Sequence, residues 1–546
     1  MRRASRPASV LTLLVVGLIT VARGAEPPIA RDVVVYGATS AGIVAAIQAQ
    51  KLGRTVIVVE PGRHIGGLTA GGLGATDIGN KKAIGGLSRE FYRRIGRHYA
   101  EAAAWTRERP GAYENRRRTP GEAEMWTFEP HAADRVYREW LAEAGVEVVM
   151  AERLDLDGGV TAEAGAIRSI RCESGRTFAG RMFVDATYEG DLMAEAGVAF
   201  HVGREANNVY GETLNGIQFA HAIKHQFTRE VDPYVMPGDP ASGLLPLISP
   251  EPVGTDGDGD DRVQAYCFRM CTTDVPDNRA EWPKPAAYDE NTYELLLRNF
   301  EAGDHRIPWN PVLMPNRKTD TNNNFAISTD FLGANYEYPC GDHATRERIV
   351  AAHRDYQQGL MWTLANHPRV PEAVRDHFRR WGPAKDEFVD NGNWPHQLYI
   401  REARRMIADM VMTQHHCQRR EIVDDPVGLG AYNMDSHNVR RVVTPEGTVR
   451  NEGDIQVGVS PYRISWRSIR PRKQECTNLL VPVCLSASHI AYGSIRMEPV
   501  FMVLGQSAAT AACLAIEAGV AIQDVPYDRL RERLLADGQV LEWTTP

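Results

Sequence analysis

Apolar runs and helical patterns alternate at the start of the chain in an order that defines its first folding unit. Asp32–Tyr36 is a short, valine-rich run, typical of parallel strands that are buried on both faces. In residues 43–52 apolar side chains recur at helical spacing, and Thr55–Val59 is a second buried run. The pattern therefore predicts a strand, a helix and a second strand, which is the βαβ unit of a parallel sheet.

The turn between the first strand and the helix predicts a dinucleotide site. Its residues, Gly37–Gly42, lie where free N–H groups and the helix dipole favour a pyrophosphate. Glu60 follows the second strand, where a carboxylate can accept hydrogen bonds from an adenosine ribose. Thr39 replaces the middle glycine of G-x-G-x-x-G, which restricts the approach of the backbone to phosphate. The cofactor-binding residues predicted here are Gly37, Thr39, Ser40, Ala41, Gly42 and Glu60.

Two further segments are predicted to approach the cofactor. Pro61–Gly79 is rich in glycine, so its backbone can come close to a ligand and offer many amide donors. Near the C-terminus, Leu479–Leu485 is a predicted buried strand and Ser486–Met497 a polar loop. A helix of small residues then begins near Pro499, and its N-terminus is an electrostatic partner for an electron-rich ring. The candidates from the first of these segments are Gly66, Gly67 and Thr69.

The middle of the chain contains further helical and strand patterns, separated by loops. Leu214–Lys224 is predicted to begin a different sheet, and residues 228–261 are dominated by proline, glycine and aspartate, which marks a loop. The predicted helices are Leu87–Ala103, Pro130–Ala144, Tyr288–Phe300, Thr345–Ala365 and Pro371–Trp381. The predicted strands are Val146–Met150, Ile167–Cys172, Met182–Val184 and Asp454–Val459.

No metal site is predicted. Asp256, Asp258 and Asp260 alternate with glycine like the first half of a calcium loop, but Cys267 stands where the loop would need its glutamate. A solvated turn is therefore the favoured interpretation. The eight cysteines lack the spacing of a zinc or iron–sulfur site, and most lie in apolar contexts that favour small buried residues.

The first 24 residues read as a secretory signal peptide. Three arginines precede the apolar run Val10–Val21, and small residues follow it. This run is too short to span a membrane, and no other stretch is long and apolar enough to do so. Because residues 1–24 contain four arginines and no acid, their removal takes the formal charge from −8 to −12. A chain with this negative charge is a poor partner for nucleic acid or anionic lipid. We therefore expect a periplasmic or secreted protein without a membrane span in its mature form.

Several motifs together resemble the FAD-dependent oxidoreductase family that includes relatives of the heterodisulfide reductase A subunit. They are Gly37–Gly42 with Glu60, Asp185–Asp191, Arg401–Arg405 and Ser488–Gln506. The resemblance covers nearly the whole mature chain. Within the family, the chain is most similar to exported bacterial members, some of which are labelled xanthan lyase. The cysteine clusters of the iron–sulfur-bearing relatives are missing here.

This resemblance implies an α/β fold: a discontinuous, Rossmann-like FAD-binding domain of the glutathione-reductase type with an inserted α+β substrate domain. The implied parts are a signal peptide (1–24), the first part of the FAD domain (32–213), the substrate domain (214–440), the second part of the FAD domain (441–525), and a C-terminal helix and tail (526–546). The cofactor is FAD, and the residues implied to contact it are Asp185, Ala186, Thr187, Gly190, Asp191, Arg496, Met497, Pro499 and Gly505.

The leading hypothesis is an exported enzyme that takes a hydride from a hydroxyl-bearing, carbohydrate-like small substrate onto flavin N5, with an unknown final electron acceptor. A histidine suits the base that must take the hydroxyl proton. His489, just before the flavin-facing helix, is the first candidate and His437 the second, while Tyr492 and Arg401 are candidates to orient substrate. The alternatives are a thiol or electron-transfer flavoprotein, or a carbohydrate lyase or binding protein that holds FAD structurally.

Overall fold

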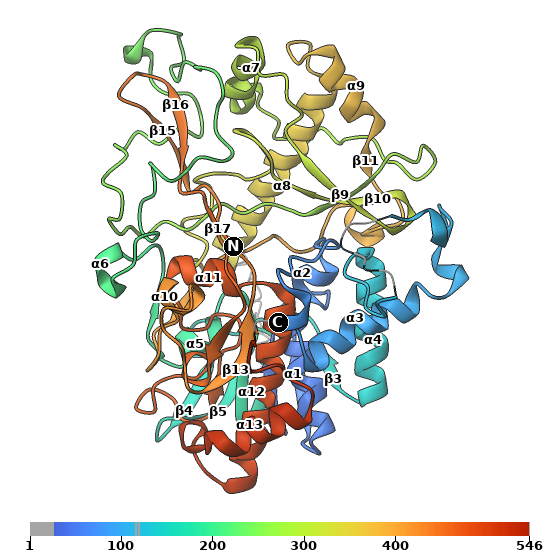
Figure 1. The fold of residues 1–546 in the computed structure, drawn as a ribbon, viewed down its shortest axis with the longest axis vertical. Coiled ribbons are helices and arrows are strands. Elements are labelled where there is room, and N and C mark those ends of the chain that lie inside the picture. The colour runs from blue at the N-terminus through green and yellow to red at the C-terminus, as the bar shows by residue number, and fades with distance from the viewer. Residues whose placement is uncertain (1–26, 115–116, 118, 120, 545–546) are drawn as a thin grey trace, which may run out of the picture.

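A computed structural model describes residues 27–114, 117, 119 and 121–544. The predicted signal peptide, 1–24, lies outside these residues. The described chain has two regions, a main sheet with its helices in the lower half of Figure 1 and a smaller sheet with its own helices in the upper half.

The main sheet is built by both ends of the chain. Its strands are β1 (Ile29–Tyr36), β2 (Val56–Val59), β3 (Glu147–Val149), β4 (Val160–Glu163), β5 (Ala166–Arg171), β6 (Thr177–Asp185) and β19 (Leu479–Leu480). The order is β3-β2-β1-β6-β5-β4, and β1, β2, β3 and β6 run parallel. The first half of β6 pairs antiparallel with β5, and its end pairs with β19 at Phe183 and Val184. Residues near 480 therefore complete a sheet that begins at residue 29.

Two helices with small residues pack closely against each other beside this sheet. They are α1 (Ser40–Lys51) and α12 (Glu498–Ala518), and both are almost entirely buried. A Cβ placed on Gly505 of α12 would lie 2.3 Å from the carbonyl oxygen of Ala41 in α1. Within the described chain α12 is the one helix long and apolar enough to cross a membrane, but 94% of that window is buried inside the protein. We had predicted no such stretch after the signal peptide, and the burial of α12 marks it as a core helix.

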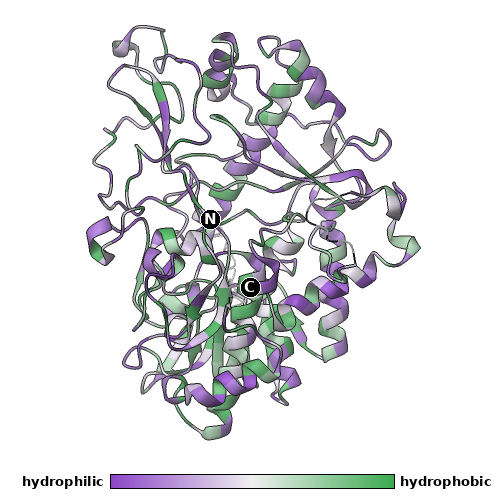
Figure 2. Ribbon diagram, in the orientation of Figure 1, coloured by the Kyte–Doolittle hydropathy of each residue, from purple (hydrophilic) through white to green (hydrophobic). Residues whose placement is uncertain are grey.

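Amphipathic helices pack around α1 and α12. They are α3 (Gly86–His98), α4 (Pro130–Ala144) and α13 (Tyr527–Ala536). Hydrophobic residues concentrate around the main sheet and α12, whereas the outer helices carry both apolar and polar residues (Figure 2). Tyr92 and Phe91 of α3 and Tyr137 of α4 are fully buried, which anchors both helices to the core.

The upper region contains a four-stranded sheet of order β11-β8-β10-β9. Its strands are β8 (Met270–Thr273), β9 (Asn310–Met314), β10 (Lys318–Asn322) and β11 (Gly382–Pro383). Its helices are α7 (Glu294–Glu301), α8 (His343–Asn366) and α9 (Glu372–Arg380). Unusually, β8 and β10 bury mostly polar residues, and the Thr272 and Thr319 hydroxyls lie 2.6 Å apart across the pair.

Short elements connect the two regions. Four two-stranded ladders pair β7 (Phe200–His201) with β12 (Arg405–Met406), β13 (Pro426–Gly430) with β18 (Tyr462–Ser465), β14 (Met434–Ser436) with β17 (Ile455–Val457), and β15 (Arg440–Val443) with β16 (Val449–Glu452). The short helices are α2 (Gly67–Ala70), α5 (Asp191–Glu195), α6 (Asn207–Tyr210), α10 (Gln414–Cys417) and α11 (His489–Ile495).

Most predicted elements are present, and three predictions were wrong. Leu214–Lys224 forms no strand, because Gly216 has a positive φ of 68° and the segment bonds to a loop near Asp258 instead. Within Leu479–Leu485 only the first two residues are strand. Ser486–Met497 is not simply a loop but contains α11, whose N-cap Ser488 accepts a hydrogen bond from Ala491 N–H.

Candidate functional site

The glycine turn before α1 forms a cradle that excludes side chains. Gly37 has a φ of 97°, and a Cβ there would lie 2.9 Å from Cγ2 of Thr187; on Gly42 it would lie 1.9 Å from the Gly37 oxygen. Thr39 caps α1, accepting a hydrogen bond from Gly42 N–H, and its hydroxyl donates to the Ala186 carbonyl at 2.7 Å. The threonine in the middle glycine position therefore ties the turn to the end of β6. The first turn of α1 leaves backbone N–H groups available to a phosphate.

Glu60 holds this cradle together from the end of β2. Its carboxylate accepts hydrogen bonds from Ala38 N–H and Gly62 N–H, both at 2.6 Å. Burial outweighs these bonds and raises the pKa of Glu60 to about 7. A carboxylate has about four acceptor positions, so it can still accept ribose hydroxyls. The donor set of the cradle thus fits the adenosine and pyrophosphate parts of FAD.

The segment after β6 lies against the cradle. Asp185 accepts hydrogen bonds from Thr187 and Met193, and burial raises its pKa to about 6. Asp191 instead forms ion pairs with Arg346 and Arg404 at 2.5 and 2.6 Å, which lower its pKa despite burial. Gly190 adopts a left-handed conformation just before α5. Asp185 therefore shapes the turn, whereas Asp191 connects it to α8 and to residue 404.

The glycine loop after β2 reaches the N-terminus of α12. The Thr69 hydroxyl donates to Glu498 at 2.7 Å, and the Tyr188 hydroxyl donates to the same carboxylate at 2.8 Å. Glu498 is 3% exposed, and burial raises its pKa. Gly66 and Gly67 both have positive φ, at the start of α2. Glu498 lies in the stretch Arg496–Pro499 that the resemblance places at the flavin, whereas sequence reasoning did not single out Tyr188, which follows the predicted residue Thr187.

Titratable side chains gather on the other side of Arg496. Its guanidinium donates to the Tyr399 hydroxyl at 2.8 Å and to Asp435 at 3.1 Å. Arg496 is buried, and among the described residues its Nε has no hydrogen-bond partner. His437 is the residue directly after β14. Its Nδ1 lies 2.7 Å from Asp330 and its Nε2 lies 3.5 Å from Asp435. Burial and Arg401 act to lower the pKa of His437, but the two carboxylates outweigh them and raise it.

His489 belongs to the same network but is more enclosed. Its Nδ1 lies 2.7 Å from Glu402 and its Nε2 lies 3.0 Å from the Ser436 hydroxyl, so both ring nitrogens have partners. Gln264 joins the two histidines: it donates to Glu402 and accepts a hydrogen bond from His437 N–H. The network therefore contains both predicted bases, and the ring of His437 has the less engaged Nε2.

The two other predicted catalytic residues have different environments. The Tyr492 hydroxyl donates to the Val483 carbonyl at 3.2 Å inside the core. Arg401 forms an ion pair with Asp330 at 3.0 Å and lies 3.2 Å from Cys267 Sγ. The structure thus brings Arg401 to His437 through Asp330, while the Tyr492 hydroxyl has a backbone partner. Six residues of this network were not predicted: Gln264, Asp330, Tyr399, Glu402, Asp435 and Ser436. The signal for Glu402 was its place in the motif Arg401–Arg405, and the signal for Asp435 was its position two residues before the predicted base His437.

The structure also bears on the alternatives, since a thiol flavoprotein needs a redox cysteine pair, for which Cys476 and Cys484 are the candidates, and a carbohydrate-binding protein needs exposed tryptophan faces. All eight cysteines are free, and burial raises the pKa of Cys476 and Cys484. Trp394 is 2% exposed, so its face offers no sugar platform. In the predicted solvated turn, Asp256 accepts from the backbone and Asp260 pairs with Arg204.

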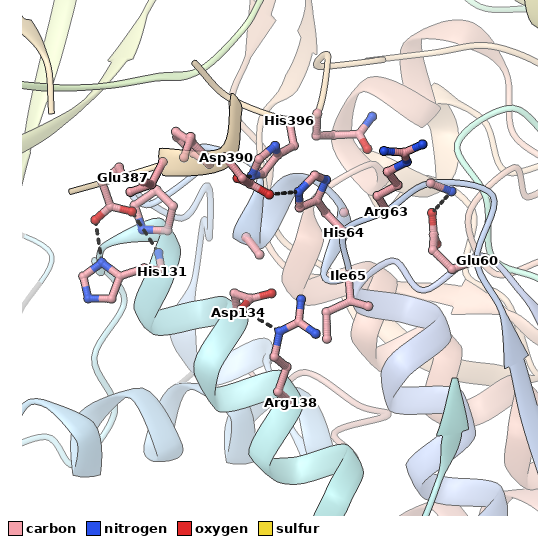
Figure 3. A pocket seen from close by; sticks show the side chains of 18 of the residues that line it. Glu60, Arg63, His64, Ile65, His131, Asp134, Arg138, Glu387, Asp390 and His396 are labelled. Carbon is pink, nitrogen blue, oxygen red and sulfur yellow. Dashed lines mark hydrogen bonds and ion pairs between the residues drawn. The ribbon is translucent and has the colours of Figure 1, made fainter. Parts of the chain in front are cut away.

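A cavity of about 390 Å³ opens beside Glu60, between the loop after β2, the start of α4 and residues 386–397 (Figure 3). Its walls are strongly charged and include Arg63, Arg138, Asp134 and Asp390. His64 and His396 stack in one part of it, and His131 contacts Glu387 in another. The cavity therefore adjoins the nucleotide cradle but not the His437 network.

Comparison with known proteins places these features in a family. A family model described as FAD dependent oxidoreductase matches residues 32–534. No curated protein matches the chain. Among solved structures, L-amino acid deaminase from Proteus vulgaris is 18% identical, with a TM-score of 0.23, over 34% of this chain and 54% of its own. L-proline dehydrogenase from P. horikoshii is 16% identical, with a TM-score of 0.23, over 33% of this chain and 59% of its own. The chain thus spans just over half of the length of these two proteins.

Proposed function

The chain belongs to the FAD-dependent oxidoreductase family and is a flavoenzyme that binds FAD; from that premise we propose that it oxidises a hydroxyl-bearing, carbohydrate-like small molecule outside the cytoplasm. Bound FAD supplies a hydride acceptor at N5. The observation that carries the proposal is the pair of His437 and Asp330 beside Arg496. Export rests on the sequence pattern of residues 1–24.

His437 is the proposed general base. Asp330 accepts a hydrogen bond from Nδ1, which favours the tautomer with a lone pair on Nε2. That lone pair takes the proton of the substrate hydroxyl as hydride leaves the carbon. Arg401 holds Asp330 on its other oxygen, so Arg401 is a positioning residue for the base. His489, our first candidate from the sequence, is a supporting residue in this proposal, since both its nitrogens are engaged.

The finer architecture is also a proposal. A glutathione-reductase-type FAD domain with an inserted substrate domain is supported by the pairing of β19 with β6 and by the contact of α12 with α1. The separate four-stranded sheet, formed by residues 270–383, supports the inserted domain. In this arrangement Arg496 and the start of α12 would hold the flavin ring, and the cradle around Gly37 would hold the pyrophosphate.

The test is anaerobic stopped-flow reduction of the enzyme's flavin by a panel of sugars and polyols. For a substrate that bleaches the wild type, His437→Ala should reduce its flavin about 10²- to 10⁴-fold more slowly per bound FAD, because it lacks the base. His489→Ala is the matched control, with an expected rate within a few-fold of wild type. Equal rates for wild type and His437→Ala would remove His437 from the role. Turnover of a carbohydrate without bleaching would favour a lyase.

A pH profile separates a base from a merely structural histidine. The base must be deprotonated, so the rate should rise with pH through the pKa of His437, which lies above the ordinary histidine value. Asp330→Asn removes a carboxylate that raises this pKa, so its profile should move to lower pH. A profile that stays in place in Asp330→Asn would contradict the dyad.

A further inference from the structure

Two histidines and an aspartate meet in the cavity beside the nucleotide cradle, at a distance from the His437 network. His64 comes from the loop after β2, and Asp390 and His396 come from a segment more than 300 residues later (Figure 3). One potential ligand atom from each side chain lies within 4.8 Å of the others. No part of the proposed oxidation uses these three residues.

The three side chains are arranged around one carboxylate. Nε2 of His64 lies 2.8 Å from one oxygen of Asp390, and Nε2 of His396 lies 3.3 Å from the other. Ligand atoms that share a transition ion at bonds of about 2.0–2.2 Å are themselves about 3–3.5 Å apart. The two nitrogen–oxygen separations are therefore close to those that a bound ion would impose.

The two imidazoles are stacked, with centroids 3.3 Å apart and planes 11° from parallel. To bring both lone pairs onto one ion, a ring must turn out of the stack. His64 and Asp390 are partly exposed, at 35% and 68% of their side chains, which leaves room for that turn.

A second cluster in the same cavity provides a contrast. Glu129, His131 and Glu387 also lie within reach of one another, but Lys318 already pairs with both carboxylates. Its ammonium lies 2.8 Å from Glu129 and 2.6 Å from Glu387 and is completely buried. This cluster therefore carries its own cation, whereas no lysine or arginine in the described chain forms an ion pair with Asp390.

We propose that His64, Asp390 and His396 bind a first-row divalent transition ion of the Zn²⁺ type, with its remaining positions open to the cavity. Imidazole with carboxylate is a donor set for zinc, iron, copper or nickel, and its nitrogen content disfavours calcium and magnesium. Three protein ligands leave at least one position for water or a small anion. The bound ion links the loop that begins at Glu60 to residues 390–396, so it clamps the nucleotide cradle to the segment across the cavity.

The experiment uses untagged, FAD-loaded protein, because an affinity tag of histidines would itself bind metal. After treatment with chelator and desalting, Zn²⁺ is titrated by calorimetry, and Co²⁺ is added separately to record its visible absorption. We expect one equivalent of Zn²⁺ and a Co²⁺ spectrum of a site with nitrogen ligands. Asp390→Asn and His396→Ala should each weaken Zn²⁺ binding at least tenfold.

His131→Ala is the matched control: it removes a histidine from the same cavity but from the cluster that Lys318 fills, and it should bind Zn²⁺ like the wild type. Asp390 is exposed, so Asp390→Asn should keep its fold and FAD content. Zn²⁺ should also raise the unfolding temperature of the wild type and leave that of Asp390→Asn unchanged. Absence of stoichiometric binding in the wild type, or equal binding in all four proteins, would overturn the proposal.

Discussion

The contact between α1 and α12 leads to a quantitative prediction about Gly505. In Gly505→Ala the new Cβ would lie 2.3 Å from the Ala41 carbonyl oxygen and 3.0 Å from the carbon and Cα of the same residue. A Cβ closer than 3.0 Å is almost never observed, so the helices must separate by about 0.7 Å. The obstacle is backbone, so no change of rotamer can relieve it.

Two effects of opposite sign decide the size of the change. Overpacking of a closely packed core costs about 1–3 kcal/mol. Alanine recovers about 0.5–1 kcal/mol over glycine inside a helix. We therefore expect a net loss of about 1 kcal/mol in the free energy of unfolding, within a range of about 0–2.5 kcal/mol. Because Ala41 lies in the first turn of α1, the shift also displaces the phosphate cradle, and FAD should bind about tenfold more weakly.

The assay combines urea unfolding of the apoprotein with an FAD titration followed by flavin fluorescence. Gly111→Ala is the control, since a Cβ at Gly111 would meet nothing within 4 Å, and its stability should stay within about 0.5 kcal/mol of wild type. If Gly505→Ala were more stable than wild type and bound FAD normally, helix propensity alone would govern the position. The reasoning about the close contact would then be refuted.

The remaining predictions concern a buried lysine, the pH dependence of Glu60 and export. Lys318→Met leaves two buried carboxylates without their cation and should cost about 3–5 kcal/mol in urea unfolding, whereas Lys385→Met at the exposed surface should change little. The pKa of Glu60 is raised to about 7 in the folded state. Protonated Glu60 therefore stabilises the apoprotein at low pH, and this stabilisation is lost as pH rises from about 4.5 to 7. In Glu60→Gln, the free energy of unfolding measured across that range should lack this pH-dependent part. Residues 1–30 fused to a reporter should direct it out of the cytoplasm with cleavage near residue 24, and a full-length cytoplasmic product would exclude export.

The sequence was most informative where structure depends on neighbouring residues. The βαβ unit was predicted because its apolar periodicity and glycine turn lie within thirty residues, and the structure confirms it. Thr39 was seen only as a departure from the glycine pattern. Its role as the cap of α1 and as a bond to Ala186 depends on a strand almost 150 residues away, which no local pattern encodes. In the same way α11 was missed, because a serine cap and short polar residues are as typical of loops as of helix starts.

The candidate site shows the same limit more strongly. His437 and Asp330 are separated by 107 residues, and His489 and Glu402 by 87, so their pairing could not be read from spacing. Sequence position favoured His489, because it precedes the helix that faces the flavin. Burial with partners on both nitrogens removes that advantage, since a base needs a lone pair that the substrate can reach.

Gln264 links the surroundings of the two histidines through hydrogen bonds. Its amide donates to the carboxylate that holds His489, and its carbonyl oxygen accepts from the backbone of His437 and from Arg496. The amide nitrogen of Gln264 can only donate a hydrogen bond and its oxygen can only accept one. The orientation of this side chain therefore fixes which neighbour accepts from it and which donates to it. A change at His489 reaches His437 only indirectly, through this shared side chain, so its effect on the rate should stay within a few-fold, and double-mutant cycles through Gln264 separate the two contributions. Additive effects of His489→Ala and His437→Ala on the rate would mean that this bridge carries no coupling.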